Sequence, residues 1–505
     1  MPFSTQQLKI VFITGIVACL AARVGFCGAG VTKSNVERAT TFFVEECKNE
    51  SNFPIILAGL RSTEDESLVP FFASLATSGD KKLRLTATSS VAMVGGNKAV
   101  LTLADRLMND PSMLVRSEAI FQLKRLNAAD KQLLTRALDI EDDAVKLIAA
   151  RGLVEKGEKT AAAEVLKELT RSRDLSTSTL ARMTLLGIGD SQQIKHLNKV
   201  ILDKNTPHRL LMRLMHQARE SKISAAGPLV DTLVDEKYPL QVRISAYMAK
   251  TAVSPESGKE IISEIQKSDN IVIQCNLMKI ICTMENSSRL FKFLLKEKGL
   301  VGDMARFEIA VGTGGDDAKA SLKKMLEPGH PIIVDYVISR MGMDIEANNK
   351  KTDFYIGPLL HFVKNADISA RRMTPTNIKI TEIIKLMGQT DSAESVRAIN
   401  DLLKEDNDKT LRELVTASLF RCDSEKICRI IHPLVKSPFP KLMKYATLIL
   451  ARHGDRRAIG PLVKLQASSL DSEIELLTLV NWYILKFASC EEAVMQTAAS
   501  ERLND

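Results

Sequence analysis

The side chains that could do chemistry in this chain are few and scattered. Cys422, Cys428 and His432 form a Cys-x5-Cys-x3-His pattern that loosely resembles a zinc site. A structural zinc site takes four ligands in tighter pairs, and no fourth ligand stands nearby in the sequence. We therefore expect no metal and no cofactor. The two cysteines straddle a predicted turn between helices, so the sequence leaves undecided whether a disulfide joins them.

The patterns of common enzymes are missing from the sequence as well. None of the seven histidines belongs to a His-Glu-x-x-His motif, and no serine lies in Gly-x-Ser-x-Gly. The glycine run 312–315 lacks the Lys-Ser/Thr of a phosphate loop, and the acidic pairs at 142–143 and 316–317 are explained more simply as helix caps. The sequence predicts a protein that is not an enzyme.

The composition is that of an ordinary globular protein with few rings. The 505 residues are 45% hydrophobic, 26% charged and only 5% aromatic. The formal net charge of +8 is mild for this length, and basic tails or long like-charge runs are absent. We therefore expect no nucleic-acid partner.

Residues 1–29 have the form of a secretory signal peptide. Lys9 precedes an apolar run from Ile10 to Ala22, and small residues follow around Ala29. The run is shorter than the roughly 20 residues of a membrane-spanning helix, so we expect no transmembrane span. Ile16 to Cys19 also resembles a lipobox, which makes a lipid anchor at Cys19 the alternative, and an apolar first helix is another. The segment predicts export to the periplasm, or an equivalent extracytoplasmic compartment, of a bacterium.

From Ser34 onward the sequence reads almost wholly as helix, because apolar residues recur at spacings of three and four. Two kinds of turn separate the helices. In one, a glycine is followed by a polar residue that can cap the next helix; its glycines are Gly96, Gly157, Gly189, Gly315, Gly388 and Gly454. In the other, a proline precedes a helix, at Pro111, Pro207, Pro239, Pro331 and Pro440.

The helices repeat with a period of about 31 residues. We mark each repeat by the apolar residue at the start of its second helix: Leu85, Val115, Val145, Leu180, Leu211, Val242, Val272, Met304, Ile333, Ile378, Leu411, Leu442 and Ile474. Only the step from Ile333 to Ile378 is badly off the period. The spacing predicts about thirteen helical hairpins, each too small to bury its own apolar stripe unless it stacks on its neighbours.

Two motifs give these repeats a family resemblance. Second helices begin as in Leu114-Val115-Arg116-Ser117-Glu118-Ala119, and the segment from Ala451 to Leu462 carries an end of a helix, a Gly-Asp turn and the start of the next helix. Residues 65–490 thus resemble the HEAT-repeat family, in its short, PBS-lyase-like form. The resemblance implies an all-α fold, an α-solenoid whose second helices line a concave face. The repeat at Leu211, which follows Pro207-His208-Arg209, lacks the Gly-Asp turn, and the repeat at Val272 lacks the basic residue.

The repeats and their interruption predict a domain organisation. After the signal segment we expect an N-terminal helical cap over 30–64, a first arm of repeats over 65–343, an irregular segment with inserted loops over 344–376, and a second arm over 377–505. Within the caps, residues 35–46 should cover the first repeat and the aromatic last helix should cover the final one.

We expect the function of a non-enzymatic scaffold that docks partner proteins and organises a multi-subunit complex or filament, with self-association left open. Each candidate contact has an alternative: hydrogen bonding within the array for the helix arginines, a tolerated insertion for the loop arginines, and capping for the aromatic pair. A bilin-lyase-like enzyme and a HEAT-like nucleic-acid-binding protein are alternative functions that the resemblance implies. The candidate contacts are Arg84, Arg116, Arg243, Arg371, Arg372, Trp482 and Tyr483.

Overall fold

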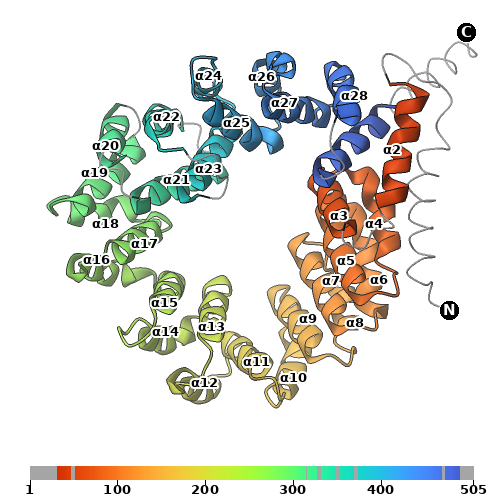
Figure 1. Cartoon of the computed structure of the whole chain (residues 1–505). Coiled ribbons are helices and arrows are strands. Elements are labelled where there is room, and N and C mark those ends of the chain that lie inside the picture. The colour runs from red at the N-terminus through yellow and green to blue at the C-terminus, as the bar shows by residue number, and fades with distance from the viewer. Residues whose placement is uncertain are drawn as a thin grey trace, which may run out of the picture. The chain divides into compact units, whose positions relative to one another are not determined.

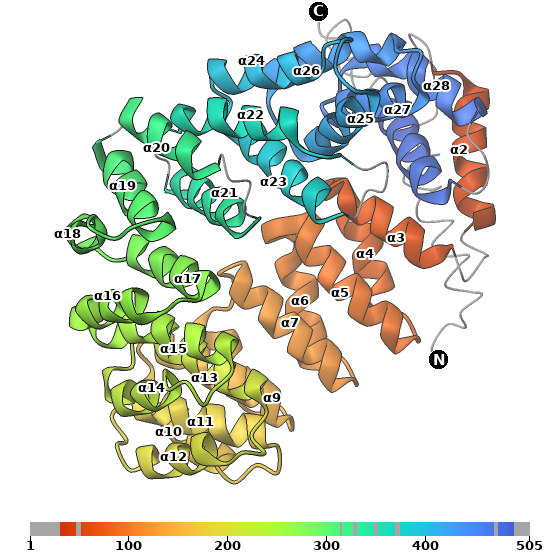
Figure 2. The same cartoon turned by 60° about the vertical axis from the view of Figure 1, so that its left-hand side comes forward.

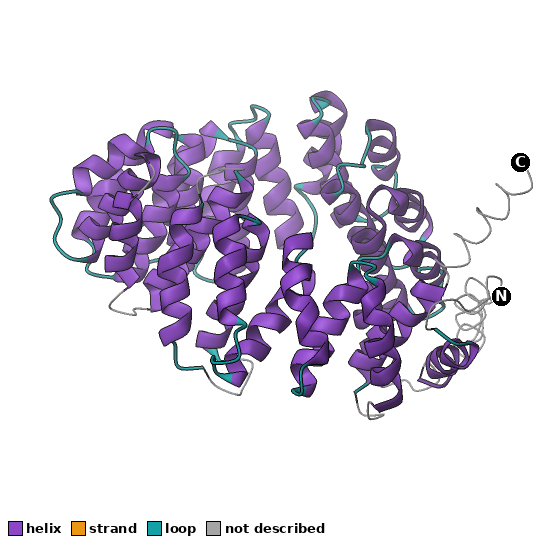
Figure 3. Ribbon diagram, turned by 90° about the horizontal axis from the view of Figure 1, so that it is seen from above, coloured by secondary structure: helices purple, strands orange, loops and turns teal. Residues whose placement is uncertain are grey.

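The computed structural model describes residues 31–46, 52–313, 316–326, 331–347, 352–368, 374–468 and 473–488. Every regular element in these ranges is a helix, and loops join the helices into hairpins (Figure 3). The predicted all-α solenoid is confirmed. Among the described residues, none of the helices combines the length and the apolar character that crossing a membrane would need.

The chain divides into two compact units. Unit 1 contains residues 1–156 together with 428–505, and unit 2 contains residues 157–427. The irregular segment predicted at 344–376 lies wholly inside unit 2, so the two arms expected from the sequence do not coincide with these units.

Unit 1 holds helices from both ends of the chain (Figure 1). These are α2 (Lys33–Glu46), α3 (Phe53–Ser62), α4 (Val69–Leu75), α5 (Lys81–Gly95), α6 (Val100–Asn109), α7 (Met113–Arg125), α8 (Lys131–Ala137), α9 (Asp143–Glu155), α27 (Pro440–Arg452), α28 (Ile459–Ser468) and a last helix over 474–488.

Unit 2 is continuous in sequence. Its helices are α10 (Lys159–Leu169), α11 (Leu175–Gly187), α12 (Gln193–Leu202), α13 (His208–Glu220), α14 (Gly227–Leu233), α15 (Leu240–Val253), α16 (Gly258–Lys267), α17 (Ile271–Cys282), α18 (Ser287–Leu294), α19 (Leu300–Thr313), α20 (Asp316–Leu326), α21 (Pro331–Glu346), α22 (Ile356–Asn365), α23 (Pro375–Thr390), α24 (Ala393–Leu402) and α25 (Lys409–Ser418). The boundary between the units falls within α26 (Glu425–Ile431).

Short 3₁₀ turns accompany several of these helices, and some of them lead into the first helix of a hairpin. They are Glu66–Leu68, Gly96–Ala99, Ser224–Ala226, Pro255–Ser257, Asp353–Tyr355, Leu419–Arg421, His432–Lys436 and Arg456–Ala458.

The 31-residue period places each of its markers in a second helix, although it has no marker for α3, which packs on α5 in the same layer. Each of the thirteen marker residues, from Leu85 in α5 to Ile474 in the last helix, lies in a second helix of the structure. In α7, Val115, Ala119 and Leu123 recur at four-residue spacing and are fully buried, which is the stripe that forces a hairpin to stack. Second helices pack on second helices, as α5, α7 and α9 do in unit 1, and first helices form the other layer.

The turns follow the sequence at most of the predicted positions. Gly96, Gly157, Gly189 and Gly454 have positive φ, which glycine adopts without a Cβ penalty. Gly388 is different, because α23 runs through it to Thr390 and the left-handed residue is Asp391 instead, with φ of 46°.

Close packing explains the glycine at position 388. A Cβ there would lie 3.0 Å from the Cys422 sulfur. The residue therefore lets α23 approach the 3₁₀ turn Leu419–Arg421 and Cys422 after it, rather than ending the helix.

The first described helices pack against the last ones inside unit 1, as both views of the ribbon show (Figures 1 and 2). Asn35 of α2 donates to the Gln466 Oε1 atom at 3.1 Å, and the Gln466 amide donates back to the Asn35 carbonyl. Arg452 pairs with Glu64 at 3.1 Å, and Lys486 pairs with Asp65 at 2.9 Å. The sequence led us to expect a separate cap at each end, whereas in the structure the first and last repeats cover each other.

Candidate interaction surface

The arginine of the second-helix motif turns inward in α5. Arg84 is only 7% exposed and donates to both carboxylate oxygens of Asp110, at 2.8 and 3.2 Å. Its remaining guanidinium nitrogen donates to the carbonyls of Ser78 and Gly79, at 2.9 and 3.1 Å. Arg84 thus ties the start of α5 to the loop that enters α7, because Asp110 stands in that loop and also accepts from the Ser112 N–H at 2.9 Å.

Arg116 and Arg243 make the same kind of tie. Arg116 donates to the Asp110 carbonyl at 2.8 Å and to Asp142 at 3.2 Å. Arg243 donates to the Val234 carbonyl at 3.1 Å and to Glu264 at 2.8 Å. Each arginine therefore joins backbone carbonyls of its own hairpin to an acid of the next one.

This pattern gives the three arginines a role inside the array, and contact with a partner stays a prediction for them. Their guanidinium groups satisfy carbonyls at helix ends that would otherwise lack donors. Hydrogen bonding within the array, which the sequence left open as the alternative, is what the structure shows for Arg84, Arg116 and Arg243. Arg371 and Arg372 lie outside the described residues.

The aromatic pair of the last helix is also inside the fold. Trp482 is 5% exposed and Tyr483 is 1% exposed, so neither ring is open to a partner in this structure. Burial raises the pKa of the Tyr483 hydroxyl well above its usual range. Among the described residues, neither the Trp482 Nε1 atom nor the Tyr483 hydroxyl has a hydrogen-bond partner, so packing holds both rings.

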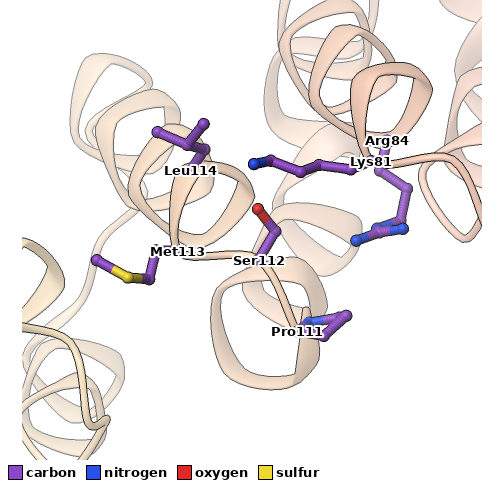
Figure 4. Close-up of a pocket in the computed structure, with 6 residues that line it drawn as sticks. All are labelled: Lys81, Arg84, Pro111, Ser112, Met113 and Leu114. Atoms are coloured by element: carbon purple, nitrogen blue, oxygen red, sulfur yellow. The ribbon is translucent and has the colours of Figure 1, made fainter.

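A pocket of about 520 Å³ opens between the N-terminal ends of α5 and α7 (Figure 4). Lys81 and Arg84 border it from α5. On the other side, Figure 4 shows Ser112 and Leu114 toward Lys81, and Met113 pointing away from it. The lining from the α7 side is Pro111, Ser112, Met113 and Leu114.

Three large apolar side chains of α7 are exposed beside this pocket, with Ser117 and Glu118 between Leu114 and Phe121. Met113, Leu114 and Phe121 are 56%, 56% and 57% exposed, and Met93 of the adjacent α5 is exposed as well. We call Met113, Leu114 and Phe121 the α7 apolar surface. Large apolar side chains grouped on one exposed helix face are typical of a protein-binding surface.

The sequence contains a signal for the α7 apolar surface. Leu114 and Phe121 are seven residues apart, two helical turns, on the face opposite to the buried Val115 and Leu123. A helix with apolar residues on both faces is expected either to be buried all round or to have a partner.

Unit 2 contains a buried polar cluster on α17, α19 and α21. The Tyr336 hydroxyl donates to Glu308 at 2.5 Å, and Arg340 pairs with Glu308 at 2.9 Å and with Asp344. Burial raises the pKa of the Glu308 carboxyl, against the opposing effect of Arg340. The cluster touches Cys282, whose sulfur lies 3.6 Å from the Tyr336 oxygen. These groups satisfy one another inside the fold, which is the usual condition for burying charge.

The predicted metal pattern does not gather ligands within the described residues. No group of three or more His, Cys, Asp or Glu side chains placed to hold a metal occurs there. Cys422 and Cys428 are both buried thiols that no disulfide joins.

Comparisons with known proteins add little to the description of the fold. No protein-family model matches the sequence, and no curated protein matches it. A solved structure of the UNC-45 chaperone, described as critical for binding and folding muscle myosin, is similar at 15% identity with a TM-score of 0.23. The match covers 98% of this chain and 63% of that one, so this chain spans less than two thirds of the chaperone's length.

Proposed function

We propose that this protein is a non-enzymatic HEAT-type scaffold whose exposed helix faces dock a partner protein within a larger complex or filament. The observation that carries the proposal is the α7 apolar surface beside the pocket at Lys81. About half of the surface of each of these three side chains is exposed to solvent. Covering this apolar surface with a partner would lower the free energy of the complex. The Arg84–Asp110 pair ties α5 to the loop that enters α7, and the Arg116–Asp142 pair ties α7 to the loop that enters α9, so α7 is held on both sides before a partner arrives.

The test is recovery of a partner by the tagged full-length chain from its native source at low salt, followed by mass spectrometry. We expect a stoichiometric partner with the wild type and its loss with the double variant Leu114→Glu/Phe121→Glu. Leu101→Glu is the matched control, because Leu101 is an exposed leucine on α6, in the other helix layer of the same unit.

The melting temperature of each variant separates a lost interface from a lost fold. A wild-type chain that elutes as a clean monomer, or a double variant that retains the partner as well as Leu101→Glu does, would contradict the proposal.

Export is part of the same proposal and rests on residues 1–29, which lie outside the described residues. N-terminal sequencing of the protein purified from its source is the measurement. A mature chain that begins near residue 30 supports cleavage, a modified Cys19 supports a lipid anchor, and an intact Met1 counts against export.

A further inference from the structure

Positive charge concentrates in one hairpin of unit 2, formed by α12 and α13. From Gln193 to Glu220 the sequence has six lysines and arginines against two acidic residues, Asp203 and Glu220, and three of the seven histidines of the chain. This is the repeat that lacks the Gly-Asp turn of the HEAT pattern. The excess is local, since the whole chain is nearly balanced at 69 basic and 61 acidic residues.

The two helices of this hairpin expose their cations on different layers. α13 packs beside α11 and α15, whereas α12 packs beside α14 in the other layer (Figure 1). On α13 the exposed arginines and histidines are His208, Arg209, Arg213 and His216. We call Arg209, Arg213 and His216 the basic strip. They stand at i, i+4 and i+7, so they share one face of the helix and extend about 10.5 Å along it.

Little within the chain neutralises the basic strip. Among the described residues, Arg209 makes no hydrogen bond and no ion pair. Arg213 donates only to the Ser176 hydroxyl, at 3.3 Å. His216 lies 3.9 Å from Glu220, but Glu220 also accepts a shorter bond from Arg219, at 2.7 Å.

The nearest acid on α11 is already committed to that helix. Asp174 caps α11 and accepts hydrogen bonds from the Thr177 N–H and hydroxyl, at 2.7 and 2.6 Å. Those bonds hold the pKa of the Asp174 carboxyl below its usual value, and the charge of Arg213 adds to the effect. Asp174 therefore stays ionised and offsets part of the Arg213 charge, while its hydrogen bonds go to the start of α11.

An apolar contact lies next to the basic strip. Met248 of α15 is exposed, and its sulfur lies 3.7 Å from the Arg219 guanidinium. Methionine adapts its shape to an incoming side chain more easily than other apolar residues. The surface thus offers a row of cations with an adaptable apolar neighbour.

We propose that the basic strip binds an acidic amphipathic helix of a partner protein, with carboxylates at i, i+4 and i+7 facing Arg209, Arg213 and His216 and an apolar side chain against Met248. The carboxylate row of such a helix has the same spacing as the cation row of α13, because both follow the α-helical repeat. Arginine suits this role, since its fork can bind a carboxylate through two hydrogen bonds.

A nucleic acid fits this surface less well. Residues 193–219 contain no Phe, Tyr or Trp on which bases could stack, and one helix presents only three cations in a row. The site lies in unit 2, away in sequence from the α7 apolar surface, and does not depend on it.

The experiment measures binding of a fluorescent fourteen-residue peptide, built from Glu and Leu at amphipathic spacing, to the full-length protein at low salt by fluorescence anisotropy. The same peptide with Gln in place of Glu and a 20-base-pair DNA duplex are the comparison probes. Arg209→Glu/Arg213→Glu is the test variant. Lys195→Glu/Lys199→Glu is the matched control, since it makes the same charge change on the other helix of the same hairpin.

We expect the Glu peptide to bind the wild type and the control variant alike, to bind the test variant at least about tenfold more weakly, and to lose affinity as salt rises. The Gln peptide should bind no variant measurably. Equal weakening by both variants, equal binding of the Gln peptide, or tighter binding of the DNA duplex than of the Glu peptide would overturn the proposal. All four mutated positions are exposed, and circular dichroism melts check that the fold is kept.

Discussion

Removing Arg84 should loosen the junction of α5 and α7 rather than weaken a binding surface. The substitution Arg84→Ala deletes two hydrogen bonds to Asp110 and two to the carbonyls of Ser78 and Gly79. The Asp110 side chain has no exposure, and it keeps only the Ser112 N–H and a longer contact to Arg106 at 3.4 Å. Breaking a buried pair from one side costs about 3–5 kcal/mol. Because Asp110 keeps those two contacts, we expect the lower end, about 3 kcal/mol.

The reciprocal substitution, at Asp110, should lower the stability of the junction slightly more. Asp110→Ala leaves the Arg84 guanidinium buried with carbonyl partners alone, and we expect about 4 kcal/mol. The double variant should lose less stability than the sum of the losses of the two single variants, because its second substitution removes a charge that the first has left unpaired. Lys98→Ala is the control, because Lys98 and its partner Glu66 are both exposed, and such pairs contribute at most about 1 kcal/mol.

Hydrogen exchange followed by mass spectrometry on peptides from α5 and α7 is the appropriate assay. Repeat arrays open locally, so the free energy of local opening reports the junction better than a global melt does. If Arg84→Ala lowers the opening free energy by no more than Lys98→Ala does, the structural role is refuted. A variant with unchanged exchange that fails to bind a partner would instead support the original interpretation of Arg84 as a contact.

Three further predictions test other parts of the molecule. Burial raises the pKa of the Cys275 thiol to about 11, from 9.0, so iodoacetamide should alkylate it in the folded protein at least about 100-fold more slowly than after unfolding, as judged by mass spectrometry. Gly454→Ala should cost about 1 kcal/mol because φ there is +70°, whereas Gly460→Ala, in open space at the start of α28, should be neutral or slightly stabilising in the same exchange assay. The pKa of Glu308 is raised in the folded state, so its stabilising effect is present below about pH 4.5 and is lost as pH rises through the folded-state pKa. The melting-temperature advantage of the wild type over Glu308→Gln should therefore shrink toward neutral pH, and a constant or growing advantage would contradict this.

The fold was predictable because helical periodicity is a local signal. The spacing of residues such as Val115, Val145 and Val242 is set by the length of a hairpin, and no distant contact is needed to detect it. The helix turn at Gly388 was mispredicted because a glycine needed for close approach to Cys422 looks the same in sequence as one needed for a left-handed turn.

The candidate interaction residues were predicted less well than the fold, because their exposure depends on contacts between repeats. Whether Arg84 points to solvent or to Asp110 is decided by a partner 26 residues away, in a different hairpin. The aromatic last helix did carry a usable signal, because apolar residues fill most positions from 474 to 487, which is typical of a helix that is largely covered. The sequence could not show that the opposite end of the chain supplies part of that cover.

The joining of the two ends in unit 1 has a consequence for synthesis on the ribosome. Asn35 and Gln466 are separated by 431 positions, so their contact cannot form until nearly the whole chain has been translated. Unit 2 is contiguous and can fold while it emerges, whereas α2 and α3 must wait for their partners in the last helices. During that interval Asn35 lacks its Gln466 partner and Asp65 lacks Lys486, so the first repeat is completed last.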